Sequence, residues 1–344
     1  MMTIQKLDKQ RGEEVRQYHQ TLTKPQGSLG RLEELAVQLA EITGQVFPAV
    51  TPPGVIVFAA DHGCTSEGVS AYPKEVTAQM VTNFLSGGAA INVLSRSIGA
   101  ALKIVDIGVA ADIDGIELST RKIKRGTNNF CVEDAMTREE AIEALNIGRE
   151  ETEMMIRHDA IKCLITGEMG IGNTTSSSAI MAVLSGKPIE TITGPGTGID
   201  TEKIKHKQQV IKKAIRLRSP DPDDPIDVLA KIGGLEIGGM AGAMLAAAAH
   251  RIPILVDGFI STVAATLAER ISPGAADYMI IGHLSTEPGH DLVIQMLGKM
   301  PLLDLGMRLG EGSGAALAFP LLEAATNILS GMATFDSAGV TNKE

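Results

Sequence analysis

The chain has 344 residues, a formal net charge of −10, 44% apolar residues and only 3% aromatic residues, with no tryptophan. Such an acidic chain has no positive field to hold a phosphate backbone and few rings to stack on bases, so we expect no nucleic-acid partner. Its three cysteines form no Cys-x-x-Cys pair, and its first residues lack the apolar segment of a signal peptide, so we expect a reduced, cytoplasmic protein. No uncharged apolar stretch reaches the roughly 18 residues of a membrane span, so we expect no membrane contact.

Short apolar runs alternate with longer helical patterns along the chain. Each short run is apolar at successive positions, which is typical of parallel strands that are covered on both faces. Strands are expected at 55–59, 102–107, 162–166, 254–256 and 278–281. Helices are expected at 29–43, 137–157, 176–184, 200–217, 235–250 and 315–325. This alternation predicts an α/β fold, with a doubly wound, mostly parallel sheet of Rossmann-like topology.

The two ends of the chain show no strand pattern and are predicted to contain only helix and loop. We therefore expect residues 46–286 to form a large α/β domain that carries the active-site loops. Residues 1–45 and 287–344 are expected to combine into a small helical subdomain.

Every predicted strand ends in a polar or glycine-rich phrase. These phrases are Asp61-His62-Gly63, Asp106-Ile107-Gly108, the stretch 167–175, Asp257-Gly258 and the stretch 282–290. In an open α/β sheet, ligands bind outside the carboxyl ends of the strands. Five such phrases at one edge of the sheet predict a single cleft.

The stretch 167–175, with the sequence GEMGIGNTT, has the composition of an anion site. Gly170, Gly172 and Asn173 can expose backbone N–H groups in a tight turn, and Thr174 or Thr175 can cap the helix predicted from residue 176. Free N–H groups and the helix dipole at such a turn favour a phosphate. The stretch lacks the Gly-Lys-Ser/Thr ending of a Walker loop.

Two further glycine loops precede predicted helices. The loop Gly194–Gly198 leads into a helix whose basic residues offer ligands for a phosphate: Lys203, Lys205, His206 and Lys207. The loop 309–314 contains Glu311 among glycine and alanine residues. Partial burial there would raise the pKa of Glu311 toward the range of a general base, whereas the alternative is a carboxylate that only stabilises the start of a helix.

Several phrases together resemble the family of nicotinate-nucleotide–dimethylbenzimidazole phosphoribosyltransferases. They occur in the order of that family and span roughly residues 20 to 340. The matching phrases are TKPQGSLGRLEELA, DHGCTSEGVSAYPKEVTAQM, GEMGIGNTT, GPGTGID, HK, DGFISTVAA, GHLSTEPGH and DLGMRLGEGSGAALA. The resemblance implies transfer of the phosphoribosyl group of nicotinate mononucleotide to 5,6-dimethylbenzimidazole, which yields α-ribazole 5′-phosphate and nicotinate during assembly of the lower ligand of cobalamin. It also implies a homodimer.

The resemblance assigns roles to individual residues. Glu311 falls on the catalytic base of the family, and Glu168 falls on an active-site acid beside the ribose. Contacts to phosphate and ribose are implied for Gly170, Gly172, Asn173, Thr174, Gly196, Gly198, Lys207, Ser285, Gly310 and Gly312. The benzimidazole pocket is implied for Ser70, Tyr72, Pro73, Gln79 and Met80. Because nicotinate leaves from a pyridinium that already carries positive charge, we expect neither a metal nor a cofactor.

Two other functions remain open from the sequence. A metal-dependent phosphohydrolase would gather ligands at the same edge of the sheet: Asp61, His62, Asp257, His283 and His290. A non-catalytic nucleotide-binding sensor would keep the phosphate loops but would have no need of Glu311.

Overall fold

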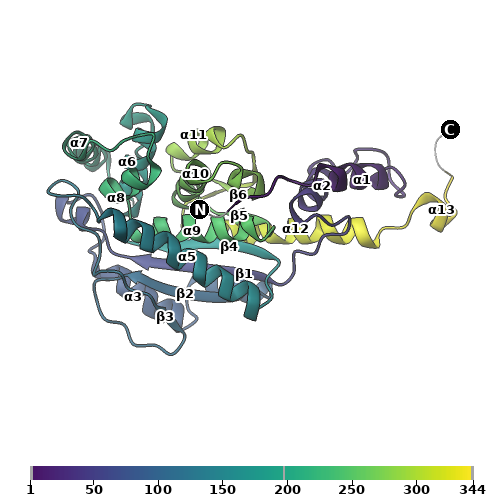
Figure 1. Cartoon of the computed structure of the whole chain (residues 1–344), viewed down its shortest axis with the longest axis horizontal. Helices are drawn as coiled ribbons and strands as arrows, with labels where there is room; N and C mark the ends of the chain where they lie inside the picture. Colours follow the sequence, from purple (N-terminus) through teal and green to yellow (C-terminus); the bar gives the residue numbers. More distant parts are fainter. Residues whose placement is uncertain (1–2, 197, 342–344) are drawn as a thin grey trace.

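Figure 1 shows the computed structural model of the chain, which describes residues 3–196 and 198–341. Within these residues the strands form one sheet in the order β3-β2-β1-β4-β5-β6-β7, and every neighbouring pair is parallel. The chain winds outward from β1 in one direction and from β4 in the other, so the doubly wound, Rossmann-like topology is confirmed. The strands are β1 (Pro53–Ala60), β2 (Ala101–Gly108), β3 (Leu118–Thr120), β4 (Cys163–Met169), β5 (Ile254–Val256), β6 (Met279–Ser285) and β7 (Pro301–Met307).

The helices include all six that the sequence predicts, and several more. They are α1 (Lys9–His19), α2 (Arg31–Thr43), α3 (Glu75–Leu85), α4 (Ala90–Ser97), α5 (Arg138–His158), α6 (Asn173–Ser185), α7 (Thr201–Arg218), α8 (Pro225–Ile232), α9 (Leu235–Ala249), α10 (Phe259–Ile271), α11 (Gly289–Met296), α12 (Ser313–Gly331) and α13 (Phe335–Ala338). None of the helices in the described part of the chain has the length and apolar character of a bilayer-spanning segment.

Alternate side chains of the strands point into two separate cores. On β1, Ile56 and Phe58 pack in the core beneath α5 and α9, whereas Val55 and Val57 pack in the core beneath α2 and α12. This period of two is what a strand covered on both faces requires. In Figure 1 the helices α5 and α9 accordingly cross the sheet on the face opposite to α3.

Glycine allows α5 and α9 to approach at backbone distance. A Cβ at Gly148 of α5 would collide with the carbonyl oxygen of Gly239, and one at Gly242 of α9 would collide with the carbonyl oxygen of Leu145. The glycine and alanine content of residues 235–250 predicts this close contact, and the structure confirms it.

The helices α1 and α2 lie beside α12 and to one side of the sheet (Figure 1). A single antiparallel bridge joins Leu22 to Thr334, and α2 packs against α12 in the same core. The division of the chain into a large domain (46–286) and a small helical part (1–45 and 287–344) stays a prediction.

The expectation of only helix and loop after residue 287 is wrong. Residues Pro301–Met307 form β7, the edge strand that pairs with β6. Pro301, Gly306 and the half-exposed pattern of the strand hide it from a reading based on apolar runs. The three-residue strand β3 at the other edge also has no predicted counterpart.

Candidate active site

The carboxyl ends of the strands bring together acidic and polar residues from four distant parts of the sequence. Glu168 lies near the end of β4, Asp257 directly follows β5, Ser285 ends β6, and Glu311 lies in the loop between β7 and α12. All four side chains are buried. The edge of the sheet therefore carries a compact group of polar side chains, as the strand-end phrases predict.

Glu168 is the carboxylate of the GEMGIGNTT stretch, and it is held by two donors. Its Oε2 accepts a hydrogen bond from Nδ2 of Asn173, and its Oε1 accepts one from the backbone N–H of Glu311 at 3.4 Å. Burial raises the pKa of the Glu168 carboxyl well above its usual range, and the nearby carboxylates of Glu236 and Asp257 raise this pKa further.

Glu311 reaches Glu168 because β4 has a glycine at the point of contact. A Cβ at Gly167 would collide with the backbone oxygen of Glu311, so the close contact between the loop and β4 requires a glycine at this position. Glu311 itself has a φ of +64°, in the left-handed region that non-glycine residues rarely occupy. Such strain often accompanies functional positions.

Glu311 is 6% exposed, and Oε2 of its carboxyl group has no hydrogen-bond partner among the described residues. Burial raises the pKa of this carboxyl, a hydrogen bond from the backbone N–H of Ile91 opposes the rise, and the charge of Asp257 adds to it. A buried carboxylate with a free oxygen and a raised pKa has the properties of a general base near neutral pH.

Asp257 holds the loop of Glu311 rather than facing open space. Its Oδ2 accepts a hydrogen bond from the N–H of Gly312 at 3.1 Å, and its Oδ1 accepts one from the N–H of Ala315 at 2.9 Å. Sequence reasoning missed this role, because the contact joins residues that are far apart in the chain and leaves no local motif.

The GEMGIGNTT stretch leads directly into α6, but not in the way that the sequence predicts. The helix begins at Asn173, and its N-cap is Gly172, with a φ of +100° and no side-chain cap. Thr174 and Thr175 lie inside the first turn, so the expectation that one of them caps a helix starting at residue 176 is wrong. The turn is tied to α3 by a hydrogen bond of 3.1 Å from the N–H of Ile171 to Oγ1 of Thr77.

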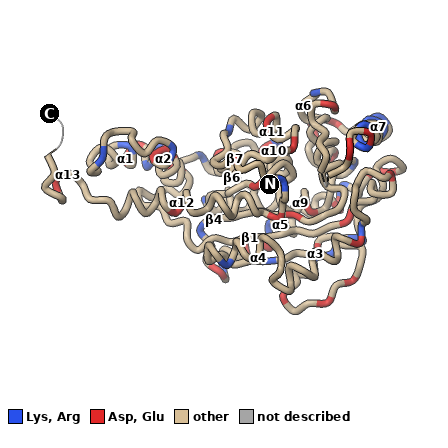
Figure 2. Tube along the Cα trace, turned by 180° about the vertical axis from the view of Figure 1, so that it is seen from behind, with Lys and Arg blue, Asp and Glu red and all other residues tan. Residues whose placement is uncertain are grey.

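Among the basic residues of α7, burial distinguishes Lys207. Lys and Arg residues are frequent along this helix (Figure 2). Lys203 and Lys205 are exposed, whereas Lys207 is 1% exposed. Its Nζ donates to Oγ1 of Thr174 at 2.9 Å and to the backbone oxygen of Gly194 at 3.4 Å. Burial lowers the pKa of Lys207 to about 8, and the charge of Glu287 opposes that change. Lys207 therefore joins the two glycine loops.

A carboxylate that the sequence reasoning did not single out, Glu287, is hydrogen-bonded to the second glycine loop. Glu287 accepts a hydrogen bond from the N–H of Gly196 at 2.9 Å, and its Oε2 is buried without a partner among the described residues. Burial raises the pKa of Glu287, while Lys207 lowers it. Of the other residues implied here, Gly198 is exposed, and residue 197 lies outside the described residues.

The residues implied for the benzimidazole pocket lie on and before α3. Ser70, Tyr72 and Pro73 belong to the loop that precedes the helix, and the side chain of Tyr72 is exposed. Gln79 and Met80 lie within α3, where Gln79 is exposed and Met80 packs partly against the core. The contact between Thr77 and Ile171 brings this helix to the turn that carries Gly170 and Gly172.

The five residues proposed as metal ligands make separate structural contacts. His62 bridges Oγ of Ser176 and Oε1 of Glu236, at 3.0 Å and 2.7 Å. His290 accepts the N–H of Ser285 and contacts Thr262. His283 lies 3.4 Å from Asp257, and Asp61 accepts the N–H of Ala110. In the described part of the chain, no three His, Cys, Asp or Glu side chains are arranged to hold a metal ion.

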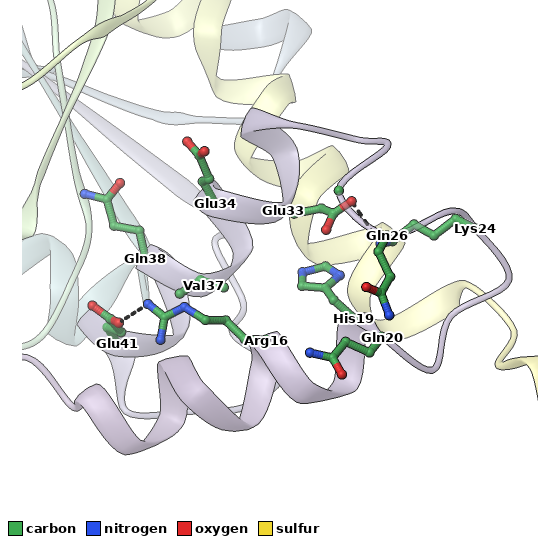
Figure 3. A pocket seen from close by; sticks show the side chains of 11 residues that line it. Arg16, His19, Gln20, Lys24, Gln26, Glu33, Glu34, Val37, Gln38 and Glu41 are labelled. Carbon is green, nitrogen blue, oxygen red and sulfur yellow. Dashed lines mark hydrogen bonds and ion pairs between the residues drawn. The ribbon is translucent and has the colours of Figure 1, made fainter. Parts of the chain in front are cut away.

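A cavity of about 450 Å³ lies elsewhere, between α1, α2 and the loop that joins them. Figure 3 shows Arg16 and His19 of α1 facing Glu33, Val37 and Glu41 of α2 across this cavity. Arg16 is paired with Glu41 at 3.1 Å. None of the residues that the sequence implies for catalysis or substrate binding lines this cavity.

Three comparisons place the chain among known proteins. The model of a phosphoribosyltransferase family matches residues 4–340. The chain is 52% identical to the nicotinate-nucleotide–dimethylbenzimidazole phosphoribosyltransferase of Chloroflexus aggregans over 98% of this chain and 96% of that protein, and 54% identical to the one from a Roseiflexus species over 94% and 91%. The crystal structure of CobT from Thermus thermophilus is similar with a TM-score of 0.93 at 44% identity, covering 97% of this chain and 100% of that one.

Proposed function

The chain belongs to the family of nicotinate-nucleotide–dimethylbenzimidazole phosphoribosyltransferases, and we propose that it transfers the phosphoribosyl group of nicotinate mononucleotide to 5,6-dimethylbenzimidazole. The products are α-ribazole 5′-phosphate and nicotinate, and the reaction belongs to assembly of the cobalamin lower ligand. The proposal is supported by the names of relatives that align over nearly the whole chain.

The observation that carries the chemistry is the free, buried oxygen of Glu311. Oε2 has no partner among the described residues, and burial raises the pKa of the carboxyl. A group that must take a proton near neutral pH needs both an open lone pair and a raised pKa. The structural alternative, a carboxylate that caps the next helix, is not supported, because Asp257 accepts the N–H groups at the start of α12.

The reaction is a displacement at C1′ of the ribose. Glu311 takes the N–H proton of the benzimidazole while the other ring nitrogen forms a bond to C1′. The bond from C1′ to the pyridinium nitrogen breaks, and its electron pair neutralises the pyridinium to release nicotinate. Attack on the face opposite the leaving group inverts the anomeric carbon.

Glu168 is proposed to face the ribose and to ionise when the positively charged nucleotide binds. Its pKa is raised in the free protein, with burial as the main cause. A bound pyridinium nucleotide brings positive charge, which favours the carboxylate form of a nearby acid. Glu168 would then stabilise the positive charge that develops at C1′ as the bond to nicotinate lengthens.

The phosphate is proposed to bind where α6 and α7 meet. Nζ of Lys207 lies 2.9 Å from Oγ1 of Thr174 there, beside Gly196 and the N-terminus of α6. A lysine that is 1% exposed and carries a depressed pKa gains a favourable partner when a phosphate arrives. The glycine turns at 172 and 310 support the proposed contacts to the phosphate and the ribose, since both have a positive φ that glycine adopts readily.

We also propose a homodimer, as the family resemblance implies, and a cytoplasmic location, as the cysteine pattern and the first residues of the sequence suggest. An exposed edge supports an interface: in β7 and the loop after it, Leu305 is 59% exposed and Leu309 is 56% exposed. An edge strand with unpaired backbone groups and apolar side chains is a surface that proteins cover by association.

Product identification tests the function. The protein is incubated with nicotinate mononucleotide and a panel of benzimidazoles, and the ribotide is identified by mass spectrometry and by the NMR coupling of its anomeric proton. The proposal expects an α-ribotide and one nicotinate per turnover. Release of inorganic phosphate instead would favour a phosphohydrolase, and tight nucleotide binding without any product would favour a sensor.

A further inference from the structure

Asp257 is tied to the residue that follows Glu311. It is 2% exposed, and its two carboxylate oxygens accept the N–H groups of Gly312 at 3.1 Å and Ala315 at 2.9 Å. Both donors belong to the start of α12. A carboxylate in this position fixes the first turn of the helix and complements the positive end of its dipole.

A second strand fixes the same turn. Nε2 of His283, on β6, lies 3.4 Å from Oδ1 of Asp257, and a Cβ at Gly314 would collide with the ring of His283. The first turn of α12 is therefore seated on β6 and held from β5. Neither contact involves the side chain of Glu311, so both act on it through the backbone.

The conformation of Glu311 requires such restraint. Its φ of +64° is costly for a residue with a Cβ, and this conformation persists only where the surroundings enforce it. Its backbone N–H is directed to Glu168, and the N–H of the next residue is directed to Asp257. These two bonds orient the peptide groups on both sides of Glu311.

We propose that Asp257 is a positioning residue for the base Glu311: it holds the 310–312 loop in its strained form and sets a fixed negative charge beside the base. This inference rests on the proposed function. Glu311 is faced by Glu168 from β4, by Asp257 from the end of β5, and by the N–H of Ile91 from α4. Glu236 of α9 adds its charge at Glu168, and His283 of β6 adjoins Asp257.

The direct test is Asp257→Asn, which keeps the size of the side chain, removes the charge and sets an amide N–H against one of the two backbone donors. We expect kcat to fall about 10- to 100-fold, as for a small misplacement of a reacting group, with little change in KM. Because the charge of Asp257 raises the pKa of Glu311, its loss lowers that pKa. The acid limb of kcat should therefore move to lower pH.

Asp224→Asn is the matched control, since Asp224 also accepts two backbone N–H groups at a helix start, at 3.1 Å each, but on α8. We expect this variant to lose some thermal stability while kcat and the acid limb stay unchanged. Gly312→Ala disturbs the Asp257 contact from the other side, because residue 312 has a φ of +88°, but it leaves the charge in place. Gly312→Ala should lower kcat without moving the acid limb. If Asp257→Asn does not fold, Gly312→Ala still tests whether the contact between Asp257 and residue 312 supports kcat.

A measurement without turnover separates this inference from the proposed function. Titration of ¹³C-labelled glutamate carboxyls by NMR gives the pKa of Glu311 in wild type and in Asp257→Asn, with Glu311→Gln to identify the signal. A downward move in Asp257→Asn supports the inference even if the wild type makes no ribotide, a result that would sink only the proposed function. An unmoved Glu311 titration together with wild-type kcat in both loop variants would overturn the inference.

Discussion

The backbone N–H of Glu311 donates to Oε1 of Glu168 at 3.4 Å, across 143 positions of sequence. The contact places two buried carboxyl groups at the carboxyl end of β4, close to a third from Asp257. Burial raises the pKa of Glu168 and of Glu311, and repulsion between like charges confined in this way raises both pKa values further.

Glu168→Gln should change how stability depends on pH. The folded state raises the pKa of Glu168 above its unfolded value, so this group contributes stability at low pH that is lost as pH rises through the folded pKa. Glutamine does not titrate. In differential scanning calorimetry, the Tm of the variant relative to wild type should therefore increase as pH rises above the usual pKa range of a glutamate toward the raised pKa of Glu168. Glu143→Gln, at an exposed position of α5, is the control and should show a constant difference.

Lys207→Met should raise the KM for nicotinate mononucleotide by about 10- to 150-fold, the effect of losing one charge-assisted contact worth roughly 1.5–3 kcal/mol. The KM for the benzimidazole should change little. Lys205→Met, on the exposed side of the same helix, is the matched control and should leave both constants unchanged. An unchanged nucleotide KM in Lys207→Met would remove Lys207 from the phosphate site.

The same lysine predicts a basic limb in the pH profile. Because burial lowers the pKa of Lys207 to about 8, the free protein loses this cation above that pH. The kcat/KM for the nucleotide reports ionisations of the free enzyme, so it should decline as pH rises past about 8. Steady-state kinetics with varied nucleotide would detect the limb, and its persistence in Lys207→Met would assign it to another group.

Much of the fold could be predicted because its signals are local. The apolar run Cys163–Ile165 and the alternation of strands and helices are visible in the sequence, and the strand-end rule correctly brings Glu168 and Asp257 to one edge. The strand β7 could not be found in this way, since its identity depends on pairing with β6 rather than on its own composition.

The parts of the site that could not be predicted from the sequence are contacts between residues that are far apart in the chain. The hold of Asp257 on the start of α12, and that of Glu287 on Gly196, join residues 55 to 91 positions apart. No local sequence pattern predicts either hydrogen bond. The opening turn of α6 differs from the prediction because Gly172 supplies a left-handed N-cap, which makes a threonine cap unnecessary.

Association through the exposed edge should be visible in solution. Sedimentation equilibrium is expected to give twice the mass of the 36.2 kDa chain. Leu305→Lys, which places a charge on the exposed part of β7, should shift the equilibrium toward monomer, whereas Val132→Lys, at another exposed apolar position, should not. A fully active monomer would contradict the proposed homodimer and leave the transfer chemistry intact.

The pH dependence of kcat in Glu311→Gln shows whether Glu311 is the base of the transfer. Glutamine keeps the shape of the side chain but cannot take a proton, so kcat should fall by about 10²- to 10⁴-fold while both KM values change little. In wild type, kcat should fall as pH drops through the raised pKa of Glu311, and this acid limb should be absent in the variant. A folded Glu311→Gln protein with wild-type kcat and an unaltered acid limb would show that Glu311 is not the base.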